Sequence, residues 1–136
     1  MIKQIEITLP PFPKGCHLIT NKIISAIGEL PETGIMHIFI KHTSAALTIN
    51  ENADPSVRGD MDKSLDFIAP ENQHFYTHTA EGADDMPAHI KTTIVGTSLT
   101  IPITKHKLNL GTWQGIYLCE FRRYAKSRKI VISIYF

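Results

Sequence analysis

Two stretches of this chain of 136 residues, 42–54 and 78–89, concentrate side chains that can transfer protons or bind metal ions. Each stretch begins with a histidine and contains carboxylates further along. The histidines and carboxylates of the two stretches are His42, Glu51, Asp54, His78, Glu81, Asp84, Asp85 and His89. Folding requires only apolar faces and turns, so this concentration of ionisable groups predicts a functional site.

The second stretch favours a divalent metal site. Pro87 is typical of a first helical position, which predicts a short helix over residues 87–95 with His89 close to its N-terminus. Histidine and carboxylate ligands suit Zn²⁺, Mn²⁺ or a similar ion. The spacing from His78 to His89 matches no compact signature such as His-Glu-x-x-His. Two exposed loop histidines therefore explain the pattern equally well. The aspartates that precede the helix are left without a structural role, and they are Asp84 and Asp85.

His42 and Ser44 follow a buried strand predicted over residues 35–40, so a rigid strand end would position both side chains. In an extended backbone they point to the same side, as a base and a nucleophile would. No Gly-x-Ser-x-Gly turn surrounds Ser44, which favours a plain hydrogen-bonding role for this serine. His42 is predicted to be an acid, a base or a ligand, with a hydrogen-bonded strand-end histidine as the equal alternative.

Asn50 and Glu51 end a second predicted strand, over residues 46–49. An amide and a carboxylate at this position have no evident structural role, which makes them candidates for catalysis. We expect them at the same edge of the sheet as His42, where the chain turns back.

Asp54 has a structural explanation, because an aspartate before Pro55 is typical of a helix N-cap. Such a cap is worth about 1 kcal/mol and requires no further function. The helix that it begins is predicted over residues 55–69. Asp60 falls within this helix, where its spacing indicates a solvated helix face.

The segment Gly111-Thr112-Trp113-Gln114-Gly115 contains the one tryptophan of the chain. Trp113 and Gln114 offer a stacking face beside an amide, which would suit a planar heterocycle. A tryptophan packed at a sheet corner is the favoured alternative. Further on, Arg122 is able to bind a phosphate or carboxylate in a bidentate manner. No Walker-type or Gly-x-Gly-x-x-Gly loop is present.

The elements that would position these residues alternate only in part between strands and helices. Further strands are predicted over residues 5–9, 98–103, 110–114, 116–122 and 129–136, and a further helix over residues 20–30. Met86 takes the N-cap position of the helix at 87–95, and residues 71–86 read as a long loop or irregular strand. About eight strands and three helices favour a single α+β domain over residues 1–136, with a largely antiparallel sheet or sandwich.

Composition narrows the class of protein. A net charge of +1 argues against a dedicated nucleic-acid binder. Two cysteines make no disulfide framework, and no apolar run reaches the roughly 20 residues of a membrane span. No basic-then-apolar leader is evident at the N-terminus. We expect a soluble, cytoplasmic protein with neither membrane nor nucleic-acid partners.

The same segments carry a family resemblance. Residues 42–55 resemble the signature of the YjbQ-type proteins, also called secondary thiamine-phosphate synthases. The resemblance continues through His78, residues 81–89, Leu99-Thr100-Ile101-Pro102, residues 110–115 and Glu120-Phe121-Arg122. It covers almost the whole chain. One departure is Lys105-His106-Lys107, where the family usually has a small glycine turn, so no pocket role is assigned to His106.

This resemblance implies a β-sandwich-like α+β fold, a homotrimer and a weak thiamine-phosphate synthase activity. That reaction joins a hydroxymethylpyrimidine diphosphate to a thiazole phosphate and releases pyrophosphate, with a divalent cation neutralising the diphosphate. The functional residues that it implies are His42, Asn50, Glu51, Asp54, Asp60, His78, Asp85, His89, Gln114 and Arg122. It therefore raises Asp54 and Asp60 above their purely structural interpretations.

Taken together, these arguments assign three kinds of site residue. The catalytic candidates are His42, Asn50, Glu51, Asp54, Asp60 and Asp85. The substrate-binding candidates are Ser44, Trp113, Gln114 and Arg122, and the ligands of a Zn, Mg or Mn ion are His42, His78 and His89. The expected partner is a small phosphorylated metabolite. The alternative function is a trimeric module that binds a small anion or metal without catalysis.

Overall fold

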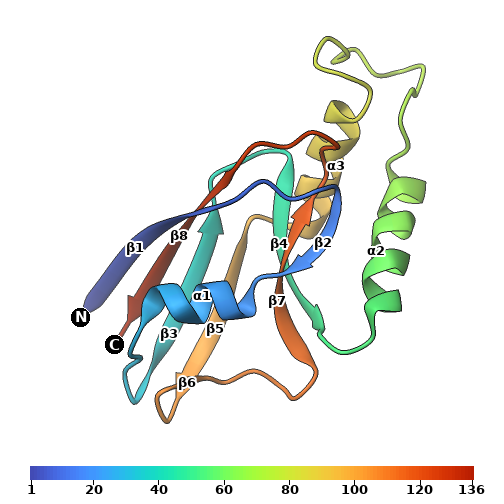
Figure 1. Ribbon diagram of the computed structural model, residues 1–136. Helices are drawn as coiled ribbons and strands as arrows, with labels where there is room; N and C mark the ends of the chain where they lie inside the picture. The colour runs from blue at the N-terminus through green and yellow to red at the C-terminus, as the bar shows by residue number, and fades with distance from the viewer.

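The chain forms eight strands and three helices, and the computed structural model describes all 136 residues (Figure 1). The strands are β1 (Ile2–Leu9), β2 (Gly15–Leu18), β3 (Thr33–Ile40), β4 (Ala45–Glu51), β5 (Ser98–Thr104), β6 (Lys107–Leu108), β7 (Gln114–Glu120) and β8 (Arg128–Tyr135). The helices are α1 (Thr20–Ile27), α2 (Pro55–Ile68) and α3 (Asp85–Val95). The predicted α+β class with antiparallel sheets is confirmed.

Two antiparallel sheets share the main apolar core. One has five strands in the order β1-β8-β3-β5-β6, and the other has three in the order β2-β7-β4. Alternate residues of both sheets meet in this core, among them Met36 and Ile38 of β3, Leu47 of β4 and Leu118 of β7. Helix α1 contributes Ile23 to the same core. Burial of these faces is the driving force that holds the two sheets together.

Helices α2 and α3 lie on the side of the three-stranded sheet that faces away from the five-stranded one (Figure 1). The central strand β7 is therefore buried on both faces along most of its length, and the first three residues of the edge strand β4 are buried as well, so neither strand shows the simple alternation of a half-exposed strand. A second, smaller apolar cluster fills this layer: Ala46, Leu65, Ala88, Cys119 and Phe121. The small side chains of Ala46 and Ala88 let α3 approach the strand closely.

Two predicted elements differ because of local turn geometry. The helix predicted over 20–30 ends at Ile27, because Gly28 takes a positive φ of 67°. The strand predicted over 110–114 is wrong. There the backbone N–H of Gln114 donates to the carbonyl of Gly111 at 3.0 Å, and the Gly111 N–H donates to the Gln114 side chain at 2.8 Å. These two bonds close a turn that no strand can contain.

Two further differences concern strand β2 and helix α3. Strand β2 was not predicted, because its four residues follow a proline-rich turn and are too few for a period. Helix α3 begins at Asp85 with Asp84 in the N-cap position, so the prediction of Met86 as N-cap is wrong. Pro87 is tolerated two positions later than expected, because the first-turn N–H groups of a helix need no partner within the helix.

The turn between β5 and β6 carries a conformational cost. Lys105 and His106 have φ angles of 52° and 62°, in the left-handed region that suits glycine and asparagine. Two left-handed residues are the geometry of a tight two-residue hairpin. The His106 ring is held by a 3.0 Å hydrogen bond from Nδ1 to the Leu30 carbonyl, which gives this histidine a structural role.

Lys105→Gly is expected to raise the free energy of unfolding by about 0.5–1 kcal/mol, because glycine removes the left-handed strain. The matched control is Lys107→Gly in strand β6, which should lower stability through the greater chain entropy of glycine. Urea unfolding of the three proteins measures both effects. Equal losses in the two variants would contradict the assignment of strain to Lys105.

Helices α2 and α3 are linked by a buried lysine. Lys91 of α3 is 3% exposed, and its ammonium donates to Asp66 of α2 at 2.5 Å. Lys14 donates to the other oxygen of Asp66 and to Asp62, both at 2.9 Å. Partial burial raises the pKa of Asp66, but the hydrogen bonds from Lys91 and Lys14 outweigh it, so the net pKa lies below its ordinary value.

Asp66→Asn is expected to destabilise the fold by about 1–3 kcal/mol near pH 7, because it leaves the charge of Lys91 buried without its counterion. The Asp66 contribution is present above the unfolded-state pKa of about 4 and is lost as the pH falls through the lowered folded-state pKa. Urea unfolding from pH 7 to pH 3 should therefore show the difference from wild type shrinking. Asp62→Asn is the control, and it should lower stability less because Lys14 still pairs with Asp66. A pH-independent difference would contradict the ion pair.

Candidate metal centre

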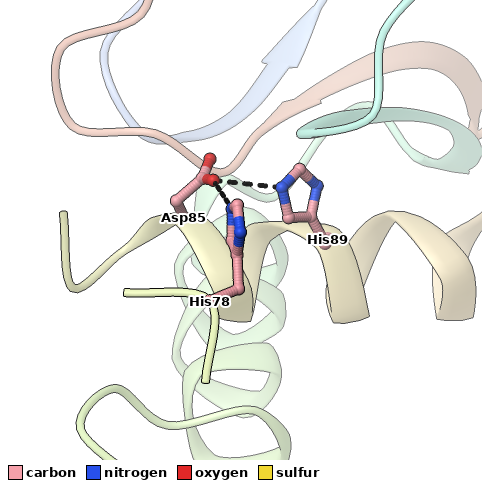
Figure 2. Close-up of side chains that lie close together, drawn as sticks. All are labelled: His78, Asp85 and His89. Carbon is pink, nitrogen blue, oxygen red and sulfur yellow. Dashed lines mark hydrogen bonds and ion pairs between the residues drawn. The ribbon is translucent and has the colours of Figure 1, made fainter. Parts of the chain in front are cut away.

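Three of the predicted site residues converge at the start of α3 (Figure 2). Asp85 is the first residue of the helix, and His89 lies one turn later on the same face. His78 reaches them from the connection between α2 and α3. The Nε2 atoms of His78 and His89 lie 2.6 and 3.0 Å from the same oxygen of Asp85, Oδ2. The prediction that His78 and His89 form a pair with a carboxylate is consistent with this placement.

The donor set fits a divalent ion. One ligand atom from each of the three residues lies within 4.8 Å of the other two. A tetrahedral zinc ion with bonds of about 2.0–2.1 Å needs ligand atoms about 3.3 Å apart, so ion binding would require the 2.6 Å contact between His78 and Asp85 to widen by about 0.7 Å. Three protein ligands with one position open are typical of catalytic zinc sites. Asp85 is only 2% exposed, whereas His78 is 44% exposed, so the site opens to solvent on the His78 side.

His89 is held in the orientation that a metal ligand needs. Its Nδ1 lies 2.8 Å from the carbonyl oxygen of Thr43. Because a carbonyl can only accept, Nδ1 carries a hydrogen, and Nε2 is the ring atom directed at the cluster. Such outer hydrogen bonds fix the tautomer of metal-binding histidines.

Arg122, which follows the C-terminal end of β7, also fixes the Asp85 carboxylate. The Arg122 guanidinium contacts the Asp85 carboxylate with Nη1, donates from Nε to Asp84 at 3.1 Å, and donates from Nη2 to the Glu81 carbonyl at 2.9 Å. Burial raises the pKa of Asp85, but the His78 hydrogen bond and the charges of His89 and Arg122 outweigh it and leave the pKa below its ordinary value. The carboxylate is therefore ionised near neutral pH, as a metal ligand must be.

Asp84 acquires a structural role that the sequence did not indicate. Its Oδ2 accepts the Arg122 side chain and also the backbone N–H of Arg123 at 3.0 Å. Burial raises the Asp84 pKa, and the hydrogen bonds from Arg123 and Arg122 lower it further than burial raises it. Asp84 thus ties the start of α3 to the residues after β7.

His42 lies near this cluster but outside it. Its Nε2 accepts the backbone N–H of Lys129 at 2.8 Å, so that lone pair is not directed at an ion. Burial lowers the pKa of His42, and the charge of Arg128 lowers it further, which keeps the ring neutral with its hydrogen on Nδ1. The structure therefore groups two of the three predicted metal ligands and leaves His42 beside them.

Ser44 has a structural partner of its own. Its hydroxyl accepts a 3.0 Å hydrogen bond from Arg128, whose guanidinium makes two bonds to the fully buried Glu120 at 2.7 and 2.5 Å. Ser44 is only 9% exposed, and its hydroxyl makes no hydrogen bond with His42. The geometry supports the hydrogen-bonding interpretation of Ser44 over the nucleophile.

Other predicted site residues lie at the far end of the same sheet. Strand β4 runs from Ala45, which pairs with Glu120, to Glu51, which pairs with Gln114. Six steps of about 3.3 Å separate these ends by about 20 Å. The expectation that Asn50 and Glu51 share an edge with His42 is wrong, because strand β4 runs its full length between them.

The residues of this far end have local partners. Asp54 caps α2 as predicted, accepting from the Ser56 N–H at 2.9 Å and from its hydroxyl at 2.7 Å, and these bonds lower the pKa of Asp54. Asn50 donates to the sulfur of Met61 at 3.3 Å. Trp113 is 63% exposed, so the alternative of a tryptophan packed at a sheet corner is wrong.

Asp60 occupies a third position, on α2. It lines an open cavity of about 470 Å³ between α2, α3 and β4, together with Thr48, Met61 and Ile94. It is therefore separate from the His78–Asp85–His89 cluster, and it borders a groove in addition to the solvated helix face that its spacing indicates.

Comparison with known proteins places the chain in a family. A family model described as "UPF0047 protein YjbQ-like" matches residues 4–135. The YjbQ protein of Salmonella typhimurium is 48% identical over 133 residues, which is 96% of each chain. A conserved hypothetical protein from Thermus thermophilus superposes with a TM-score of 0.84 at 31% identity, over 94% of this chain and 97% of that one.

A YjbQ/UPF0047 family protein from Clostridium acetobutylicum gives a TM-score of 0.82 at 40% identity, over 96% of this chain and 98% of its own. These matches show that the protein has a YjbQ-like α+β fold. The chain belongs to the YjbQ (UPF0047) family. Its longest helix, α2, has 14 residues, and none of the helices combines the length and apolar character that crossing a membrane requires.

His78→Ala and His89→Ala are each expected to weaken Zn²⁺ binding at least tenfold, because each removes one of three ligands. His74→Ala, an exposed histidine of the same connection, is the control and should bind like wild type. Competitive titration against a chromophoric chelator, supported by elemental analysis, measures the affinities. Wild-type affinity in both ligand variants would refute the centre.

Proposed function

We propose that this protein is an enzyme that acts on a small phosphorylated metabolite with the help of a divalent metal ion. The observation that carries the proposal is the cluster of His78, Asp85 and His89, in which His89 lines one cavity and Asp85 contacts Arg122, which lines a second. A divalent ion bound to these residues would supply charge neutralisation for a phosphate or diphosphate group. The ionised Asp85, the oriented His89 and the Arg122 brace would hold the ligand atoms in place before substrate arrives.

His42 is suited to contact the substrate directly. It lines two neighbouring cavities, and His89 lines one of them. Because its Nε2 accepts from Lys129, its Nδ1–H is available as a hydrogen-bond donor. A neutral donor of this kind can bind an oxygen of a leaving phosphate. We therefore assign His42 to substrate binding and stabilisation of the leaving group.

The reaction we propose is of the thiamine-phosphate synthase type. A carbon–nitrogen bond forms between the methylene of a hydroxymethylpyrimidine diphosphate and the ring nitrogen of a thiazole phosphate, while the carbon–oxygen bond to the diphosphate breaks. The leaving diphosphate takes the bonding electrons, so the catalytic need is stabilisation of anionic oxygens. No side-chain nucleophile is required, which agrees with the engagement of Ser44 by Arg128.

We further propose that a homotrimer combines the two ends of the β4–β7 pair into one site. In a cyclic trimer each subunit uses two different surfaces, so the far end of one chain can meet the near end of the next. This would bring Glu51 to the cluster of a neighbouring chain. Exposed apolar side chains on the helical layer and at the far end support such an interface: Phe67, Ile68, Ile94 and Trp113.

A subunit-complementation experiment tests the shared site. His89→Ala and Glu51→Gln are each expected to reduce thiamine-phosphate formation at least 100-fold. Co-expressed in one cell with separable tags and purified through both tags, they should form mixed trimers that recover about one third of wild-type activity, because one of the three interfaces in each mixed ring carries both intact residues. The doubly substituted chain mixed with wild type is the control for subunit exchange.

Two outcomes contradict parts of this proposal. Mixed trimers without recovery would show that His89 and Glu51 do not act in one intersubunit site. Wild-type protein with bound metal and no product from the two thiamine precursors would refute the reaction. Substrate binding without turnover would then favour the alternative, a module that binds a phosphorylated metabolite without catalysis.

A further inference from the structure

The Arg122 side chain is not free to bind a substrate phosphate. Its Nε, Nη1 and Nη2 atoms are directed at Asp84, Asp85 and the Glu81 carbonyl. Neighbouring Arg123 pairs with Glu71. Binding of an anion by Arg122 would compete with these carboxylates and loosen Asp85. A substrate phosphate therefore needs another cation near the metal centre.

We propose that a phosphate group binds in the cavity beneath the β7–β8 connection and is held by Lys126, Ser127 and Arg128. This assignment rests on the proposed function and names the substrate-binding part of the same site. The cavity has a volume of about 420 Å³, within the range of small-molecule sites. Arg122 and His42 also line it, and Arg122 contacts Asp85, so the cavity lies beside the metal centre.

The charges around this cavity favour an anion. None of its lining residues is acidic. The acidic neighbour Glu120 is fully buried behind Arg128, so it cannot approach a ligand in the cavity. Lys126 is exposed and makes no ion pair within the chain, which leaves its ammonium charge available. A single uncompensated cation at the wall of a concave site attracts phosphate and contributes a charge-assisted hydrogen bond.

Arg128 adds a preorganised donor. Its Nε and Nη2 are occupied by Glu120 and Ser44, whereas Nη1 has no partner within the chain. No polar side-chain atom is both buried and unpaired, so Nη1 is not fully buried, and Arg128 lines the cavity. The bidentate bond to Glu120 fixes the guanidinium plane, and a phosphate therefore binds Nη1 with little loss of side-chain entropy. The Ser127 hydroxyl and the Nδ1–H of His42 complete the donors.

Tyr124 indicates what the phosphate is attached to. It lines the same cavity, yet 96% of its surface is exposed. An aromatic ring beside an anion site is suited to stack on a planar group that carries the phosphate. The ligand class is thus a phosphate or diphosphate ester of an aromatic heterocycle, with the phosphate in the cavity and the ring against Tyr124.

Calorimetric titration of metal-free protein with inorganic pyrophosphate tests the anion site independently of the metal centre. Lys126→Ala should weaken pyrophosphate binding about 10-fold or more, and Lys126→Arg should restore it. Lys107→Ala, an exposed lysine on β6, is the charge-matched control and should bind like wild type. Equal affinity of Lys126→Ala and wild type would overturn the site.

Thiamine phosphate is the probe for the aromatic part of the proposal. Tyr124→Ala should weaken thiamine phosphate binding about 3-fold to 10-fold and leave pyrophosphate binding unchanged, and Tyr124→Phe should preserve both. Loss of binding of both ligands in Tyr124→Ala, or of neither, would overturn the stacking role.

A comparison of the two binding sites separates this inference from the proposed function. Loss of Zn²⁺ binding in His78→Ala with pyrophosphate binding retained supports two adjacent subsites. Failure of the enzyme assay with the anion titrations as expected refutes the reaction and leaves the phosphate site intact.

Discussion

The buried ion pair between Glu120 and Arg128 is the interaction on which the arrangement of the site depends. It joins the end of β7 to the start of β8, and the same guanidinium donates to the carbonyl and hydroxyl of Ser44 just before β4. Removing two charges from water costs several kcal/mol per ion, so the pair is stable only because the guanidinium and carboxylate are paired twice. A bidentate geometry tolerates little movement. The ends of three strands are therefore held in one relative position, from which Arg122 reaches Asp85.

A second set of contacts connects these strand ends to the cluster of His78, Asp85 and His89. Arg122 bridges the residues after β7 to the start of α3, and Thr43 orients His89 through its carbonyl oxygen. Asp85 is in the middle, with one oxygen bonded to the arginine and the other facing the two histidines. The arginine keeps the carboxylate ionised, and the ionised carboxylate aligns both imidazole rings. A proton or a metal ion can occupy the same position, so the two compete, and ion binding must release the histidine protons.

The periodicity of the sequence predicts most of the helices and strands. It does not predict which of the site residues lie close together in the fold. The Asp54 cap, helix α2 and the class of fold follow from local patterns, because caps and amphipathic faces are local interactions. The turn at Gly111 and Gln114 depends on a side-chain bond that no periodicity reveals. The placement of Glu51 was wrong for a different reason. Two residues that flank a strand are close in sequence but lie a full strand length apart in space. Only the pairing of the strands shows which end of the sheet each residue occupies.

The separation of about 20 Å between the two ends of β4 constrains every account of the family likeness. The likeness implies functional roles for residues at both ends, and no side chain spans that distance. Either the family has two sites in each chain or one site is built from two chains. The first alternative leaves Glu51 beside a turn and a helix cap, at the opposite end of β4 from the His78–Asp85–His89 cluster. In the second, one heterologous interface serves both ends at once, because closure of a ring repeats the same contact at every subunit. Assembly would then be a condition for catalysis, and the chain would supply the two halves of its site at opposite ends of one pair of strands.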